Sequence, residues 1–182
     1  MPAENFDELV RRVLDASESD VWGIAVGEWA VSQLEEDPLG CGVCVCGHTG
    51  LVKLFTITNQ RNRALLYPIG SVCVNQFGRE ELDQQVKVYD ELLRLRKAIL
   101  DGSRIRLTSD LFSRALLVWL FNEGSFPPDE YNNFDGERDL EFLLKMFNKR
   151  NKDALTRPQQ KKITAILLAK VMPFVRNYEN LK

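Results

Sequence analysis

Apolar side chains recur at helical spacing over most of this chain. Near the amino terminus they fall at positions i, i+3, i+4, i+7 and i+8 of one stretch, which predicts an amphipathic helix over residues 4–16. Later stretches repeat the same spacing. They predict helices over residues 21–34, 80–100, 111–120, 137–149 and 157–172. The pattern therefore predicts a mostly α-helical protein.

The pattern changes after residue 50. Residues 51–58 are rich in β-branched and apolar side chains and predict a strand, residues 59–62 predict a turn, and residues 64–67 predict the returning strand of a hairpin. Asn62 is expected to take the left-handed conformation that this turn requires. Gly70 then marks the start of another helix. A hairpin of this size needs outside support to fold.

Several residues indicate where the later helices begin and end. Thr108 or Ser109 is expected to cap the helix over residues 111–120. Thr156 and Gln159 have the spacing of a capping box, with proline in the first turn of the helix that follows. That helix should end near Pro173, since the residue before a proline is biased away from helix.

These elements divide the chain into three segments. We expect acidic helices over residues 1–40, a knuckle, hairpin and helix start over residues 41–79, and further helices over residues 80–182. The segments are expected to form one compact unit. The predicted fold class is therefore mostly α within an α+β fold, with a β-hairpin embedded among helices.

The cysteines give the strongest chemical signal. All four cysteines and the single histidine of the chain lie within 33 positions: Cys41, Cys44, Cys46, His48 and Cys73. Thiolates and imidazoles are the ligands of a tetrahedral zinc site. Neighbouring glycines permit a tight knuckle, and the last thiol falls at a helix start, where the helix dipole favours a thiolate. The pattern predicts a structural Zn²⁺ that stabilises the hairpin.

The order of knuckle, hairpin and helix resembles the treble-clef zinc fingers. Residues 44–47 (CVCG), 54–59 (LFTITN) and 68–77 (PIGSVCVNQF) are similar to a zinc-binding segment of small bacterial and phage proteins of uncharacterised role. The resemblance covers residues 41–79 only. It implies a zinc-binding protein of bacterial or phage type.

One ligand remains open. A treble clef draws two ligands from its helix, but the residue three positions after Cys73 is Gln76, a poor zinc ligand. The fourth ligand is therefore expected from the knuckle. Cys41 is preferred because its spacing to Cys44 is typical of knuckles, and His48 is the alternative.

Other interpretations of the cysteines are weaker. Four cysteines could be ordinary core residues, or Cys41 and Cys44 could form a redox pair, but neither explains three cysteines within six positions beside two glycines. Residues 41–79 contain no Asp or Glu that could act as a general base, and no protease or deaminase motif occurs. We therefore expect a non-enzymatic protein. A divergent zinc nuclease or deaminase is the weakest alternative.

The net charge of −2 conceals a strong segregation of charge. Residues 1–40 carry 10 acidic and 2 basic side chains, whereas residues 145–182 carry 2 acidic and 10 basic ones. The predicted contacts to nucleic-acid phosphates are Arg61, Arg63, Arg157, Lys161 and Lys162. Two competing interpretations need no nucleic acid: the charged residues form solvated helix faces, or the acidic segment covers the basic one. Segregated charge of this kind also suits a charged protein partner.

The remaining patterns bear on location and partners. No apolar run is long enough to span a membrane and the acidic start is unlike a signal peptide, so we expect a cytoplasmic protein without membrane contact. The loop aromatics Phe126, Tyr131 and Phe134 either fold over the core or form a recognition patch. The sequence thus predicts a zinc-binding accessory or regulatory protein that binds nucleic acid, with a protein-interaction module (an inhibitor or adaptor) as the alternative.

Overall fold

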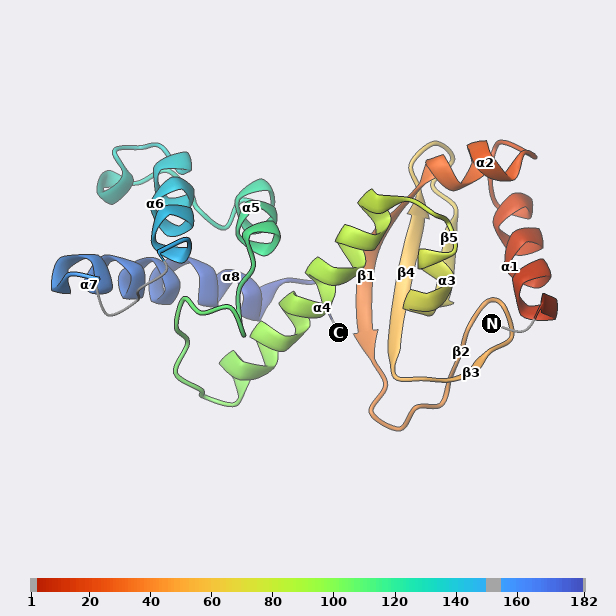
Figure 1. Ribbon diagram of the computed structural model, residues 1–182, viewed down its shortest axis with the longest axis horizontal. Coiled ribbons are helices and arrows are strands. Elements are labelled where there is room, and N and C mark those ends of the chain that lie inside the picture. Colours follow the sequence, from red (N-terminus) through yellow and green to blue (C-terminus); the bar gives the residue numbers. More distant parts are fainter. Residues whose placement is uncertain (1–2, 150–154, 182) are drawn as a thin grey trace. The chain divides into compact units, whose positions relative to one another are not determined.

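A computed structural model describes residues 3–149 and 155–181 (Figure 1). The chain forms two compact units. The first extends to Tyr89 and includes the chain end from Glu179, and the second runs from Asp90 to Tyr178. The expected segments 1–40 and 41–79 both fall in the first unit, whereas the expected segment 80–182 is divided between the two units. The units are described separately below.

The first unit combines short helices with a small sheet. Its elements are α1 (Ala3–Asp15), α2 (Trp22–Ala25), the 3₁₀ turn η1 (Val26–Glu28), β1 (Trp29–Glu36), β2 (Gly42–Val43), β3 (Thr49–Leu51), β4 (Lys53–Asn59), β5 (Leu65–Ile69), α3 (Ser71–Asn75) and the start of α4 (Glu80–Leu100). The predicted hairpin is confirmed as β4 and β5, and the first predicted helix is confirmed as α1.

The prediction of a helix over residues 21–34 is wrong from residue 26 onward. Strand β1 begins at Trp29 and pairs antiparallel with β4, giving the order β1-β4-β5. Trp29, Val31 and Leu34 are buried, and a register shift between Val31 and Gln33 lets all three face the core. The bulge breaks the two-residue alternation, so the strand resembles a helix in sequence. Segment 1–40 is therefore not purely helical.

The outer edge of β1 is covered by other parts of the first unit. From α4, Gln85 accepts a hydrogen bond from the Val31 N–H at 2.8 Å, and the Tyr89 hydroxyl donates to the Ser32 carbonyl at 2.9 Å. The Leu34 N–H donates to the Asn180 carbonyl at 3.0 Å. These contacts satisfy backbone groups that an open edge strand would leave unpaired.

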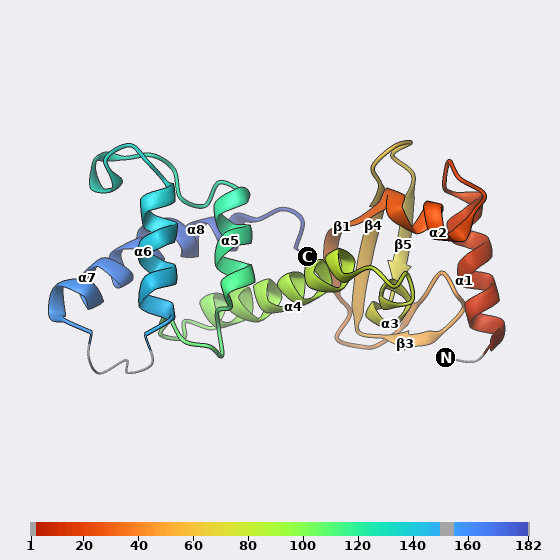
Figure 2. The same cartoon turned by 45° about the horizontal axis from the view of Figure 1, so that its top comes forward.

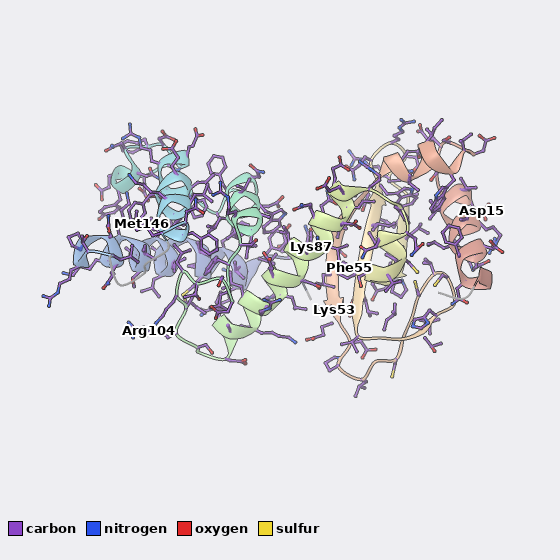
Figure 3. The ribbon with its side chains drawn as sticks, in the orientation of Figure 1. Asp15, Lys53, Phe55, Lys87, Arg104 and Met146 are labelled. Carbon is purple, nitrogen blue, oxygen red and sulfur yellow. The ribbon has the colours of Figure 1, made fainter. Side chains whose placement is uncertain are left out.

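The core of the first unit lies around β4. Phe55, labelled in Figure 3 on this strand, is fully buried together with Ile57 and Leu34. Helix α3 lies against the sheet beside the start of α4 in both views (Figure 1, Figure 2). Trp22 adds edge-to-face contacts with Phe6 and Phe77. The sheet thus holds the hairpin and α3 in one apolar core.

The secondary-structure elements that the structure describes in the second unit are all helices. It contains the rest of α4, then α5 (Arg114–Asn122), the 3₁₀ turn η2 (Glu130–Asn132), α6 (Glu137–Phe147), α7 (Arg157–Ile166), the π-helix η4 (Leu167–Val171) and α8 (Met172–Asn177). The capping box of Thr156 and Gln159 is confirmed. Over the ranges that the structure describes, no helix is both long and apolar enough to cross a membrane.

Two helix boundaries in this unit differ from the prediction. The cap of α5 is Ser113 and not Thr108 or Ser109, because the Ser113 hydroxyl accepts a hydrogen bond from the Leu116 N–H at 3.0 Å. The last helical stretch does not end near Pro173. This proline lies in the first turn of α8, directly after the π-helix, and the helical stretch continues to Asn177.

The loop from residue 124 to 136 is fixed by buried polar groups. Lys170 bridges Asp129 at 2.7 Å and the buried Asp139 at 2.6 Å. Of the loop aromatics, Phe126 is buried as expected for a residue folded over the core, whereas Tyr131 and Phe134 are 81% and 75% exposed. The coarse α+β class is confirmed, and the sequence did not indicate strand β1 or the short strand pair β2 and β3.

Candidate metal centre

Three of the four predicted cysteines come together. The sulfur atoms of Cys44 and Cys73 are 3.5 Å apart, and those of Cys73 and Cys46 are 3.3 Å apart. All three side chains are buried, with exposed fractions of 3–4%. All three are free thiols. This group is referred to below as the thiol cluster.

A tight turn between β2 and β3 presents two of these sulfurs. The Cys44 N–H donates to the His48 carbonyl, and the Gly47 N–H donates to the Cys44 carbonyl, both at 2.7 Å. Gly47 has a φ of 86°, a value that favours glycine. Upstream, a Cβ atom at Gly42 would lie 2.9 Å from the Leu51 carbonyl oxygen, so this position also favours glycine.

The third sulfur comes from α3, immediately after β5. The Gly70 N–H, at the N-cap of α3, donates to the Cys44 sulfur at 3.4 Å. The Val45 N–H donates to the Pro68 carbonyl at 2.9 Å and attaches the turn to the end of β5. The hairpin therefore carries the chain from the turn to α3 and closes the thiol cluster.

Sharing of protons among the thiols changes their acidity. The pKa of Cys44 is lowered to about 5, chiefly because the Cys73 thiol hydrogen-bonds to it, with the Gly70 N–H assisting. The same contact raises the pKa of Cys73, and burial raises it further. The cluster thus favours the thiolate form of Cys44, and the thiolate is the form of cysteine that binds a metal ion.

The dimensions of the cluster suit a metal ion. For zinc–sulfur bonds of about 2.3 Å in a tetrahedral site, neighbouring sulfurs are roughly 3.8 Å apart. The separations of 3.3 and 3.5 Å are slightly shorter, so a small outward movement of the side chains accommodates an ion. Cys44, Cys46 and Cys73 could hold a metal ion together.

No protein-family model, curated protein or solved structure matches the chain. The evidence for a metal site is therefore the geometry of the three thiols.

The two candidates for a fourth ligand lie in different places. Cys41 is exposed, its N–H donates to an Asp37 carboxylate oxygen at 2.7 Å, and it lies outside the thiol cluster. His48 is also exposed, but it lines a pocket of about 640 Å³ together with all three clustered cysteines. Of the two candidate fourth ligands, His48 is therefore the one that lines the same pocket as the thiol cluster.

The predicted basic residues of the hairpin turn have unequal surroundings. Arg61 lies 3.6 Å from the carboxylate of Glu28. Arg63 is exposed and has a φ of 65°, so it takes the left-handed position that was expected of Asn62. Asn62 instead contributes its side chain to the turn, accepting a hydrogen bond from the Ala64 N–H at 2.9 Å.

Glu28 is a buried carboxylate beside the hairpin turn that the sequence did not indicate. It is buried, and accepts hydrogen bonds from the N–H groups of Glu18 and Ser19 and from the Asn59 amide. Burial acts to raise the pKa of Glu28, but these hydrogen bonds and Arg61 outweigh it, so the pKa lies below its usual value. The sequence did not indicate these hydrogen bonds, because Glu28 lies inside a stretch predicted to be a helix.

The remaining predicted basic residues lie on α7, in the second unit. Arg157 and Lys161 are exposed and lie four residues apart, on one stripe of the helix. Lys162 points elsewhere, with its ammonium 4.7 Å from the centre of the Phe142 ring. The five predicted contacts are thus distributed over two units and three different surroundings.

Proposed function

We propose that Cys44, Cys46 and Cys73 bind a structural zinc ion and that the protein acts by binding another macromolecule. The observation that carries this proposal is the group of three buried thiols around one point, joined by a turn, a hairpin and a short helix. Thiolate ligands suit zinc among the common metals. Zinc bound there supplies folding energy to a small hairpin module.

His48 is the fourth ligand that the pocket supports best, and Cys41 is the alternative. A zinc ion held by three thiolates and one imidazole has a closed coordination shell, as structural sites do. The described residues that line the pocket include no carboxylate, so it offers no acidic general base. This supports a binding role over a hydrolytic one.

The favoured partner is a protein. Val52 and Val72 line the pocket beside the thiol cluster and are 44% and 60% exposed, so they offer apolar contact area. A partner with an exposed apolar side chain would complement this surface. The contact of Arg61 with Glu28 also weighs against a phosphate-binding role for the hairpin turn.

Nucleic acid is the second candidate. Arg63, Arg157 and Lys161 are exposed cations that could contact phosphates. Titration of the full chain with an oligonucleotide at several salt concentrations tests this directly, because phosphate contacts give a steep dependence on salt. Failure to bind at low ionic strength would remove this candidate.

The protein-partner proposal is tested by comparing two exposed valines. Partners captured from cell extract by the wild-type chain should be lost with Val72→Glu, which places a charge at the pocket. They should be retained with Val118→Glu, since Val118 is also exposed, at 40%, but lies on α5. Equal capture by the two variants would contradict a partner at the pocket.

A further inference from the structure

A second pocket lies wholly within the second unit. It has a volume of about 580 Å³ and lies between the segment from Ser103 to Thr108 and residues of the segment from Leu155 to Met172. This volume is within the range of sites that hold small organic molecules. None of the predicted functional residues lines it, so it is separate from the thiol cluster and its pocket.

The lining has one dominant chemistry. Most of it is aliphatic, and Ile163, Leu167 and Leu168 supply one wall. The charged groups on the described lining are two guanidinium groups, those of Arg104 and Arg106, and no carboxylate is among them. Apolar walls with one charge sign favour a ligand that has an apolar body and the opposite charge.

The two arginines are available to a ligand. Both are exposed, and within the part of the chain that the structure describes neither forms an ion pair or a side-chain hydrogen bond. Figure 3 shows Arg104 on the loop that follows α4. Guanidinium groups donate paired hydrogen bonds to carboxylate or phosphate oxygens.

Helix geometry places further positive charge beside this pocket. Gln160, Thr164 and Leu168 line the pocket at four-residue spacing along α7 and η4. Arg157 and Lys161 continue next to this stripe at the start of α7, since residues four apart lie on one face. The π-helix η4 contributes Leu167 and Leu168, and single π turns occur frequently at functional sites.

We propose that this pocket binds an anionic amphiphile, with its hydrocarbon chain against Ile163, Leu167 and Leu168 and its anionic head group at Arg104 and Arg106. The walls exclude water from the chain, and the guanidinium groups compensate the charge of the head group. Carboxylate and phosphate head groups share this chemistry. The site does not depend on the metal centre of the first unit.

Calorimetric titration of the full chain tests the proposal. Decanoate and decyl phosphate are the probes, and decyltrimethylammonium is the control with the same chain length and the opposite charge. The two anions should each bind at a single site. The cation should bind at least about tenfold more weakly, because it lacks a charge-assisted hydrogen bond to a guanidinium group. The tighter of the two anions identifies the head group.

Variants assign the binding to this pocket. The double variant Arg104→Gln/Arg106→Gln should weaken decanoate binding at least about tenfold. Leu168→Trp should weaken it by filling the pocket, and Leu168 is 57% exposed, so the larger side chain is tolerated. Arg176→Gln, at an exposed arginine on α8 outside the lining, should leave the affinity unchanged.

Three results would overturn the proposal. The first is an equal affinity for decanoate and decyltrimethylammonium, which would show adhesion without recognition of charge. The second is an equal loss of binding in the double variant and in Arg176→Gln. The third is displacement of decanoate by a single-stranded oligonucleotide, which would assign these cations to nucleic-acid phosphates.

Discussion

Asn59 offers the sharpest test of how the hairpin turn is held. Its side chain is fully buried, and its amide oxygen accepts hydrogen bonds from the Arg61 N–H at 2.8 Å and the Asn62 N–H at 3.2 Å. Its amide nitrogen donates to the Glu28 carboxylate at 2.6 Å. One side chain therefore holds the turn and joins it to the acidic amino-terminal region.

Truncating this residue removes all of these contacts. In Asn59→Ala the two turn N–H groups lose their acceptor, which costs about 1 kcal/mol each. The free energy of unfolding should therefore fall by at least about 2 kcal/mol, before the lost donor to Glu28 is counted. With a urea dependence of about 2 kcal/mol per molar, the midpoint should fall by about 1 M.

Urea denaturation followed by tryptophan fluorescence measures this shift. A Trp119→Phe background leaves Trp22 and Trp29 as reporters of the first unit. Gln60→Ala is the matched control, since this neighbouring amide is exposed and its side chain bonds only to the Thr58 carbonyl in the described structure. If Asn59→Ala and Gln60→Ala had the same urea midpoint, the Asn59 side chain would not stabilise the turn as proposed.

Two further predictions concern the second unit. Gly136→Ala should lower its melting temperature, because the added carbon would lie 2.1 Å from the Phe126 carbonyl oxygen, whereas Gly23→Ala, in open space in the first unit, should not. The pKa of Asp129 is lowered, chiefly by its hydrogen bond from Lys170, and the pKa of Lys170 is raised by its carboxylate partners in spite of burial. Stability from this pair should therefore be present near neutral pH, and should be lost as pH falls through the lowered Asp129 pKa or rises through the raised Lys170 pKa, which circular dichroism across pH would detect. A flat profile, or equal melting temperatures of the two glycine variants, would contradict these expectations.

The sequence predicted the elements whose periodicity is unbroken. The apolar stripes of α1, α4 and α6 repeat without interruption, and each helix lies close to its predicted range. The run of β-branched and apolar residues in β4 likewise predicted the hairpin. Strand β1 was missed because its bulge shifts the buried positions to three-residue spacing, which imitates a helix, and because its partner β4 lies far along the chain.

The sequence likewise predicted one part of the candidate site and missed another. The four cysteines within 33 positions predicted a cluster, and Cys44, Cys46 and Cys73 lie together because the hairpin returns the chain to the turn. Spacing alone favoured Cys41, which lies outside the thiol cluster and whose N–H donates to an Asp37 carboxylate oxygen. Tertiary contacts of this kind leave no local signal in a sequence.

Elemental analysis of the purified full chain tests whether the thiol cluster binds a structural zinc ion. We expect about one equivalent of zinc in the wild-type chain. The zinc should be retained in Cys41→Ser if His48 is the fourth ligand, and it should be lost in Cys73→Ser together with the fold of the hairpin module. Less than about half an equivalent in the wild-type chain, or full retention of zinc in Cys73→Ser, would contradict it.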